Sequence, residues 1–229
     1  MTMTSGLRRV RAFLLRSTGH FDPTGRSASP LNRDYGYSRG TPVDRYYIEQ
    51  FLARHSADVR GHVLEIGDDS YSRRFGGARI ERQDVLYVSA AEPRATIVGD
   101  LSAPGVLPPQ TFDCIILTQT LHLIFDLAQA IKQLRQSLRP GGTVLITVPG
   151  ITAIHGSWKD SWYWSLTEAS LSRLLCQEFD AANVEVLTCG NFLAATAFLQ
   201  GAAVEELDEA ELDRLDAAYP VIVAGRARA

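Results

Sequence analysis

The sequence has few cysteines, no long apolar run and no excess of positive charge. The three cysteines, Cys114, Cys176 and Cys189, show no C-x-x-C spacing, so we expect reduced thiols, no metal site and a cytoplasmic protein. No apolar run approaches the roughly 20 residues that cross a bilayer, so we expect no membrane association. With 23 Lys and Arg against 26 Asp and Glu, no basic surface for nucleic acid is expected.

Length and composition predict one domain preceded by an arm. The chain has 229 residues, of which 45% are hydrophobic, enough to bury one core. We expect residues 1–42 to form a short amphipathic helix, over 7–16, and an irregular arm rich in Gly, Ser, Pro, Asp and Arg. Residues 43–229 then form the domain. The basic start is not typical of a signal peptide, because its apolar stretch is short and no small-residue cleavage site follows.

Apolar runs alternate with segments of helical periodicity. The runs that predict strands are 62–66, 78–83 (ending at Asp84), 95–98, 112–117 and 143–148. The segments between and before them that predict helices are 44–55, 71–76 and 127–138. This alternation predicts a parallel sheet with right-handed crossovers. The last third predicts helices over 167–179, 191–199 and 205–216, and strands over 184–188 and 219–224.

The loop after the first predicted strand is poor in glycine. Only Gly67 stands where a nucleotide-binding loop usually has two or three glycines, and Asp68 and Asp69 follow it. Two carboxylates would repel a pyrophosphate but suit a cationic or zwitterionic ligand. A nicotinamide oxidoreductase is therefore disfavoured, since its G-x-G-x-x-G motif is also missing.

Polar residues stand at the predicted ends of four strands: Glu65, Asp84, Asp100 and Thr118. Ligands of open α/β sheets bind outside the carboxyl ends of the strands. Asp84 follows Gly67 by 17 residues, close to the spacing at which an acid binds ribose hydroxyls. Each acid alone is equally well explained as a helix cap or a solvated loop residue. Their recurrence at successive strand ends favours a nucleoside site.

Four motifs resemble class I S-adenosylmethionine-dependent methyltransferases, in particular the small-molecule branch called type 11. They are Glu65-Ile66-Gly67, Gly99-Asp100-Leu101 and the segments 112–116 and 138–142. The resemblance covers residues 43–225, with a glycine-poor first motif in which Asp69 and Tyr71 stand where the family usually has glycines. It implies a Rossmann-like α/β fold, whose seven-stranded, mostly parallel sheet has helices on both faces. Its antiparallel last strand lies between the fifth and sixth.

The resemblance also implies the cofactor, S-adenosylmethionine, its product, S-adenosylhomocysteine, and a set of residues that bind it. Glu65, Gly67 and Asp68 are expected at the methionine end, and Asp84 and Val85 at the ribose. Asp100 and Leu101 are expected at the adenine, and Thr118 and Gln119 beside the transferred methyl group. Methyl transfer is an in-line displacement, in which positioning of the acceptor supplies most of the acceleration.

Two histidines are candidates for a general base, which is needed only if the acceptor loses a proton in the step. His122 follows the fourth predicted strand by about one turn, and His155 lies in the loop after the fifth. A packing or surface role is the favoured reading of each histidine, more so for His155. Neither has a partner at metal-ligand spacing, so no metal is expected.

Aromatic residues gather in two segments expected near the site. Segment 155–164 holds all three tryptophans, and Trp158 and Trp162 are candidates for an acceptor-binding wall. The alternative is that these rings pack a helix against the sheet. The arm over 33–47 is dense in Tyr and Arg and is predicted to cover the cofactor as a lid. Its candidates are Arg39, Arg45 and Tyr46 for the cofactor and Tyr35 for the acceptor, and a surface strap is the alternative.

The sequence thus predicts an enzyme that transfers a methyl group from S-adenosylmethionine to a small-molecule acceptor. An oxygen nucleophile and a specialised metabolite, as in natural product biosynthesis, are favoured. The alternative is a protein that keeps the fold without methylating. It would then serve as a binding or assembly partner, or use the cofactor for another reaction. A homodimer through the N-terminal helix and the acidic 205–216 segment is compatible with the sequence.

Overall fold

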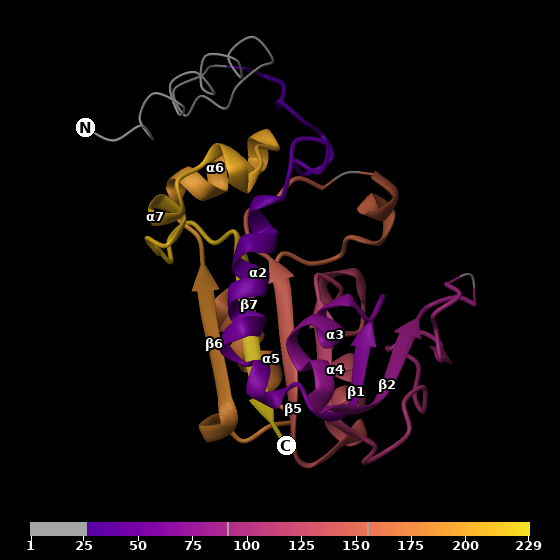
Figure 1. Cartoon of the computed structure of the whole chain (residues 1–229). Helices are drawn as coiled ribbons and strands as arrows, with labels where there is room; N and C mark the ends of the chain where they lie inside the picture. Colours follow the sequence, from indigo (N-terminus) through magenta and orange to yellow (C-terminus); the bar gives the residue numbers. More distant parts are fainter. Residues whose placement is uncertain (1–26, 91, 155) are drawn as a thin grey trace.

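The protein is built on one seven-stranded sheet with helices on both faces (Figure 1). The computed structural model describes residues 27–90, 92–154 and 156–229, so the helix predicted over 7–16 lies outside the described residues. The strands are β1 (Gly61–Ile66), β2 (Ile80–Tyr87), β3 (Ile97–Val98), β4 (Phe112–Thr118), β5 (Leu138–Pro149), β6 (Val184–Cys189) and β7 (Ile222–Arg228). Their order is β3-β2-β1-β4-β5-β7-β6, and β7 runs antiparallel to both of its neighbours. The expected fold, including the place of the last strand, is confirmed.

The central strands contribute side chains to two separate hydrophobic cores, one on each face of the sheet, because successive residues of a strand point to opposite faces. On β4, Cys114 and Ile116 belong to one core and Ile115 and Leu117 to the other, all with no exposed surface. The first core lies under α2 (Val43–Arg54) and α6 (Phe192–Gln200), the second under α4 (Leu127–Ser137) and α5 (Glu168–Leu175). Figure 1 shows α2 in front of the sheet and α4 and α5 behind it.

Helix starts follow local capping chemistry, since the first backbone N–H groups of a helix have no partner within it. The side chain of Asp126 accepts a hydrogen bond from the N–H of Gln129 at the start of α4. Thr167 caps α5, as predicted, and Asn191 caps α6. These caps place the starts of the three helices at or next to their predicted positions. No helix in the described part of the chain is both long and apolar enough to cross a bilayer.

The predicted end of β2 is wrong. The strand runs on past Asp84 to Tyr87 and pairs with β1 along its length. Asp84 is tolerated inside a strand because its carboxylate is fully engaged. Nε2 of His62 lies 2.5 Å from one carboxylate oxygen, and the hydroxyl of Thr96 donates to the other at 2.7 Å. A buried polar group with partners costs little, so its polarity does not mark a strand end.

The prediction of one acidic helix over residues 205–216 is also wrong. The segment forms a 3₁₀ turn, η6 (Val204–Glu206), and a single short turn of helix, α7 (Glu209–Leu212). The side-chain amide of Asn191 donates to the carbonyl oxygens of both Glu211 and Arg214, each at 2.7 Å. Because these carbonyl oxygens bind Asn191, they do not accept the backbone hydrogen bonds that would extend α7.

β5 begins before its predicted start, and β7 begins and ends later than the predicted 219–224. β5 starts at Leu138, directly after α4, so segment 139–142 ends the helix as expected but belongs to the strand. β7 includes the basic residues that follow Ala224. Arg226 fits there because its guanidinium pairs with both carboxylate oxygens of Asp58, at 2.7 and 3.1 Å. β3 is shorter than the predicted 95–98, since it spans only Ile97–Val98.

Candidate functional site

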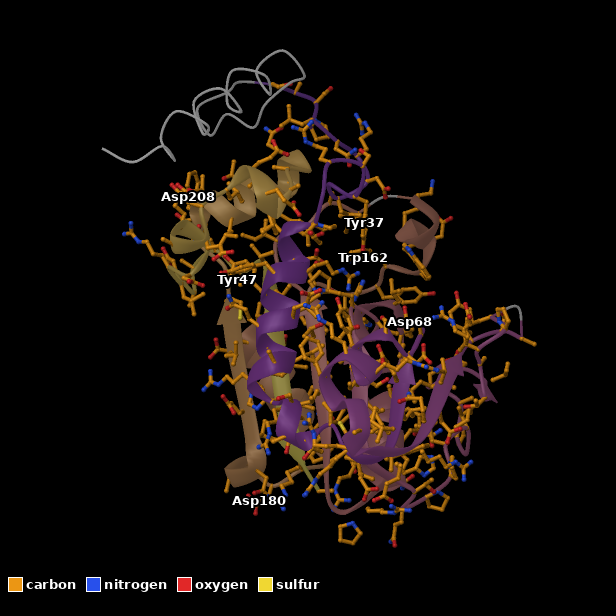
Figure 2. The ribbon with its side chains drawn as sticks, in the orientation of Figure 1. Tyr37, Tyr47, Asp68, Trp162, Asp180 and Asp208 are labelled. Atoms are coloured by element: carbon orange, nitrogen blue, oxygen red, sulfur yellow. The ribbon has the colours of Figure 1, made fainter. Side chains whose placement is uncertain are left out.

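A pocket of about 1180 Å³ lies outside the carboxyl ends of β1, β2, β4 and β5. The chain leaves β1 toward β2 on one side, whereas β4 and β5 lie on the other side of β1, so the direction of strand order changes here. Such a switch point is where open α/β sheets bind ligands. Figure 2 labels Tyr37, Asp68 and Trp162, which line the pocket from the arm, the loop after β1 and the segment after η4 (Gly156–Ser161).

The glycine-poor loop after β1 needs only one residue with positive φ. Gly67 has a φ of 100°, a value that favours glycine. Asp69 has a φ of −124°, and Tyr71 lies within α3 (Ser70–Gly76). The side chains at these two positions therefore cause no backbone strain. A short turn with one glycine leads directly into α3.

Glu65, at the end of β1, holds this turn together. Its carboxylate accepts hydrogen bonds from the backbone N–H groups of Tyr71 (3.2 Å) and Ser72 (2.7 Å), at the start of α3. Burial raises the pKa of Glu65 to about 7, although these hydrogen bonds oppose the increase. Glu65 therefore binds the loop and also lines the pocket.

Asp68 and Asp100 both line the pocket and both close a turn. Asp68 accepts hydrogen bonds from the backbone N–H (2.8 Å) and hydroxyl (2.6 Å) of Ser70. Asp100 accepts the same pair of bonds from Ser102, each at 2.8 Å. Burial favours a higher pKa for Asp68, but the bonds from Ser70 and the charge of Arg94 outweigh it and lower the pKa. Both carboxylates are thus held in place by their own turns.

The end of β4 presents strained and buried polar groups to the pocket. Gln119 has a φ of 47°, in the left-handed region that non-glycine residues rarely adopt, and its side-chain Nε2 is buried without a partner. Such strain is concentrated at functional sites. Thr118 lines the pocket next to it, and the hydroxyl of Thr120 donates to the Thr118 carbonyl at 2.9 Å.

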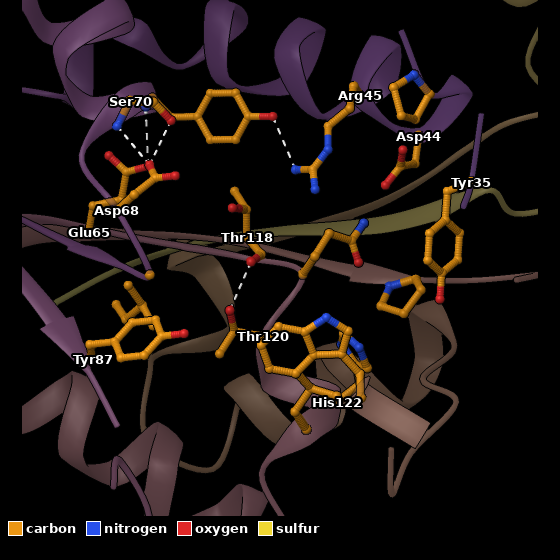
Figure 3. A pocket seen from close by; sticks show the side chains of 18 of the residues that line it. Tyr35, Asp44, Arg45, Glu65, Asp68, Ser70, Tyr87, Thr118, Thr120 and His122 are labelled. Atoms are coloured by element: carbon orange, nitrogen blue, oxygen red, sulfur yellow. Dashed lines mark hydrogen bonds between the residues drawn. The ribbon is translucent and has the colours of Figure 1, made fainter. Parts of the chain in front are cut away.

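His122 is buried against Trp162 in the wall of the pocket (Figure 3). Their ring centroids are 4.2 Å apart, and Nδ1 of His122 and Nε1 of Trp162 are both buried without a partner. Burial lowers the pKa of His122 to about 4. The imidazole is therefore neutral at pH 7 and can accept a proton, but as a weak base.

The arm covers the opposite side of the pocket. The guanidinium of Arg45 donates to the hydroxyl groups of Tyr37 and Tyr71, each at 3.2 Å. Burial favours a lower pKa for Arg45, but the neighbouring Asp44 and tyrosines outweigh it and raise the pKa. Tyr35 has a φ of 52°, and its hydroxyl donates to the Ala153 carbonyl at 3.2 Å. The arm is thus joined to the loop after β5.

Most of the sequence-predicted residues meet at this pocket. Those that line it are Tyr35, Arg45, Glu65, Gly67, Asp68, Asp100, Leu101, Thr118, Gln119, His122, Trp158 and Trp162. His155 lies outside the described residues. These residues therefore lie together at one end of the sheet, while the roles assigned to them stay predictions.

Four predicted residues do not line the pocket. The carboxylate of Asp84 is bound by His62 and Thr96, and Val85 is buried within β2, two residues before the observed strand end at Tyr87. Arg39 forms two 2.8 Å bonds with the carboxylate of Glu206. The hydroxyl of Tyr46 donates to Asp213 at 2.7 Å. Arg45 and Tyr46 are successive residues of α2, whose side chains point about 100° apart around the helix, so Arg45 lines the pocket while Tyr46 contacts Asp213 at the end of α7.

Sequence reasoning missed Tyr87 and Asp44, which both line the pocket. Tyr87 is the true last residue of β2, and only the correct strand end could have identified it. Asp44 left a clearer signal. Together with Tyr47, Ile48 and Phe51 it follows the i, i+3, i+4, i+7 spacing of the buried face of α2. An acid in the first turn is also favoured by the helix N-terminus, so this spacing marks Asp44 as a candidate and does not assign its function.

Comparison with known proteins identifies the family. A family model described as a methyltransferase domain matches residues 23–188. The chain belongs to this methyltransferase family. Probable polyketide synthase 7 of Dictyostelium discoideum is 29% identical over 102 residues, and the match covers 42% of this chain. The methyltransferase described here spans only 4% of the length of that relative.

Solved structures share the fold of this methyltransferase at low sequence identity. An S-adenosylmethionine-dependent methyltransferase from Archaeoglobus fulgidus is 12% identical, with a TM-score of 0.53 over 81% of this chain and 94% of that one. The N-methyltransferase NodS from Bradyrhizobium japonicum, in complex with S-adenosylhomocysteine, is 16% identical, with a TM-score of 0.52 over 86% and 92%. The cyclase SpnF is 17% identical, with a TM-score of 0.52 over 97% and 93%.

Membership of the methyltransferase family confirms the family predicted from the sequence. S-adenosylmethionine, the cofactor that the resemblance implies, fits the pocket electrostatically. Seven carboxyl groups and three guanidinium groups line it, which favours a ligand with cationic sulfonium and ammonium groups. The buried oxygen of Asp44 without a partner adds an acceptor for a polar ligand.

Proposed function

We propose that this methyltransferase transfers a methyl group to the hydroxyl oxygen of a small-molecule acceptor. The observation that supports this most directly is the division of the pocket into two halves (Figure 3). Glu65, Asp68 and Tyr87 lie on one side, whereas His122 and Tyr35 lie on the other. The first half suits a nucleoside with an amino acid, and the second suits an acceptor held against aromatic rings.

In the first half, the chain offers a group for each part of the cofactor. We assign Glu65, Gly67 and Asp68 to the methionine ammonium end and the guanidinium of Arg45 to its carboxylate. Leu101 and Asp100 are assigned to the adenine, as the resemblance implies. Tyr87 takes the ribose position in place of Asp84, because its side chain lies at the strand end where a hydroxyl can bond the diol. Bound S-adenosylmethionine supplies an electrophilic methyl carbon on a good leaving group.

In the second half, His122 receives the proton that the acceptor loses. Bound S-adenosylmethionine would supply the methyl group, and its sulfur would keep the electron pair of the carbon–sulfur bond that is replaced by the bond to the acceptor oxygen. The hydroxyl proton passes to Nδ1 of His122, which is buried and without a partner. Because the pKa of His122 is only about 4, its contribution is modest and most of the acceleration comes from positioning.

A specialised metabolite is the acceptor class that we favour. The match to probable polyketide synthases supports it in a limited way, since it covers 102 residues of very large proteins. The pocket wall formed by Trp158 and Trp162 also supports it, because flat rings pack well against planar or sugar-like molecules. The three cysteines are all free, which supports the proposed cytoplasmic location.

A protein of this fold that does not methylate is the alternative. Tyr87 stands where an acid was expected at the ribose, and the similar fold of a cyclase shows that such a scaffold also occurs in a protein named for another reaction. Retained cofactor binding without formation of S-adenosylhomocysteine over a panel of hydroxylated acceptors would favour this alternative.

Calorimetric titration with S-adenosylmethionine and S-adenosylhomocysteine is the first test of the proposed function. We expect both to bind with dissociation constants in the micromolar range. Formation of S-adenosylhomocysteine on addition of acceptors, measured by mass spectrometry, tests the transfer. If neither compound binds, the assignment of this pocket to the cofactor is wrong.

A further inference from the structure

The acceptor half of the pocket holds a group of buried polar atoms without partners. In the described part of the chain seven buried side-chain atoms lack a hydrogen-bond partner, and four of them belong to the pocket wall. They are Oδ1 of Asp44, Nε2 of Gln119, Nδ1 of His122 and Nε1 of Trp162. Each such group costs roughly 1–3 kcal/mol if it stays unsatisfied. Their clustering indicates a wall arranged to bind a polar ligand.

Asp44 is the only carboxylate in that group. It lies in the first turn of α2 and is 8% exposed, and none of the ion pairs found among the described residues includes it. Its neighbour Arg45 directs its guanidinium toward the hydroxyl groups of Tyr37 and Tyr71. In Figure 3 the Asp44 carboxylate points into the pocket beside Tyr35, on the half opposite Glu65 and Asp68. The charge of Arg45 and the backbone N–H groups of Asp44 and Arg45 stabilise this carboxylate in part, but its Oδ1 has no hydrogen-bond partner. A buried carboxylate oxygen left in that state is costly, so a cationic ligand group in this place stabilises it.

Other pocket cations already have partners. Arg74 pairs with Glu49 at 2.6 Å, and Arg94 pairs with Glu92 at 2.9 Å. Arg74 and Arg94 are therefore not available to bind an anionic acceptor, and the seven carboxyl groups that line the pocket would repel such an acceptor. The aromatic rings of Tyr35 and Trp162 provide negative π faces near a ligand cation. Charge and ring chemistry thus both favour a cation in the acceptor half.

We infer that the acceptor carries an aliphatic amine, which binds as an ammonium group to the carboxylate of Asp44 and fixes the orientation of the acceptor. This inference rests on the proposed function. An ammonium nitrogen has no lone pair, so the anchored nitrogen does not attack the methyl carbon. The reacting atom is a hydroxyl oxygen elsewhere in the same molecule, held toward His122. Asp44 is then a specificity-determining residue for an amino alcohol or amino sugar.

The test compares amine and alcohol members of matched pairs, benzylamine with benzyl alcohol and glucosamine with glucose. Each is titrated by ligand-observed NMR into the full-length protein saturated with S-adenosylhomocysteine. We expect the amine of each pair to bind at least tenfold more tightly than the alcohol. Asp44→Asn is expected to abolish this preference and to leave the affinity for S-adenosylhomocysteine unchanged.

Glu49→Gln is the matched control, because Glu49 lines the same pocket from the same helix but is paired with Arg74. It is expected to keep the preference for amines. Equal binding of amine and alcohol by the wild-type protein overturns the inference without any variant. A preference that survives in Asp44→Asn, or a loss of S-adenosylhomocysteine affinity in that variant, also overturns it. Failure of the wild-type protein to bind S-adenosylhomocysteine instead contradicts the proposed function itself.

Discussion

At the scale of single residues, Asp84 and Tyr87 show how a shift of three positions changes a functional assignment. Both are polar residues of β2, but Asp84 is bound within the sheet while Tyr87 lines the pocket. Their contributions can therefore be separated. Asp84 is expected to contribute to stability, and Tyr87 is proposed to bind the ligand.

Tyr87→Phe is expected to weaken binding of S-adenosylhomocysteine about three- to tenfold, which corresponds to about 1 kcal/mol for one hydrogen bond. Asp84→Asn is the control. It is expected to leave that affinity unchanged but to lower the free energy of unfolding by about 1–3 kcal/mol, because His62 and Thr96 lose a charged partner. Titration calorimetry and urea unfolding measure the two effects. The reverse pattern would return the ribose position to Asp84.

His122 is expected to affect turnover rather than affinity. His122→Ala removes the group that we propose as the proton acceptor, so we expect turnover to fall about tenfold to a hundredfold. The dissociation constant of S-adenosylhomocysteine is expected to stay within a factor of two, since the residue lies in the acceptor half. Steady-state kinetics with an active acceptor, together with calorimetry, checks both quantities. Full turnover in the variant would show that the acceptor proton leaves by another route.

At the scale of elements, the arm is attached to the domain by specific bonds. Arg39 pairs with Glu206 of η6, and the backbone N–H and hydroxyl of Thr41 donate to Glu205 at 2.9 and 2.8 Å. Pro42 forms a bridge with Ala203 next to them. These bonds hold the N-terminal end of α2, and so the position of Arg45.

Arg39→Ala and Arg45→Ala are expected to act differently. Arg45→Ala should weaken S-adenosylhomocysteine binding tenfold or more, because it removes a guanidinium from the pocket. Arg39→Ala should change that affinity less than threefold while lowering the free energy of unfolding by about 1.5–3 kcal/mol, since the buried Glu206 loses a charged partner. Glu206→Gln is the control, because it weakens the Arg39–Glu206 ion pair and leaves Arg39 in place. Unchanged binding in both arginine variants would contradict a role for the arm in the site.

At the scale of the whole molecule, two buried groups give stability opposite dependences on pH. The pKa of His122 is lowered to about 4, so the unfolded chain takes up this proton first and stability is lost as pH falls from about 6.5 to 4. The pKa of Glu65 is raised to about 7, so its contribution is lost as pH rises from about 4.5 to 7. Burial also raises the pKa of Asp44, which acts in the same direction as Glu65.

Substitution should separate these opposing contributions. Between pH 4.5 and 6.5, Glu65→Gln is expected to make the free energy of unfolding rise more steeply with pH than in the wild type. His122→Asn is expected to make it fall more steeply. Each group contributes on the order of 3 kcal/mol across its full window. Urea unfolding without ligand at several pH values measures the slopes, and identical slopes in all three proteins would show that neither pKa is shifted as described.

Local pattern was sufficient for the order of the elements and for much of the site. The apolar run of β4, the capping residue Thr167 and the motif around Gly67 depend on neighbours in sequence, because strand alternation and helix capping act over a few residues. These patterns also placed Glu65, Asp100, Thr118 and His122 in one pocket, since the carboxyl ends of parallel strands share one edge.

The strand and helix ends and the site residues that were predicted wrongly depend on contacts between segments distant in sequence. Asp84 lies inside β2 because His62 of the neighbouring strand binds it, and α7 ends early because Asn191 binds its carbonyl groups. Arg39 does not line the pocket because it pairs with Glu206, 167 residues further along the chain. Whether a polar side chain faces a ligand or a partner depends on which groups the fold brings within about 3 Å of it. Burial without such a partner singles out Asp44, and only the packed structure contains that information.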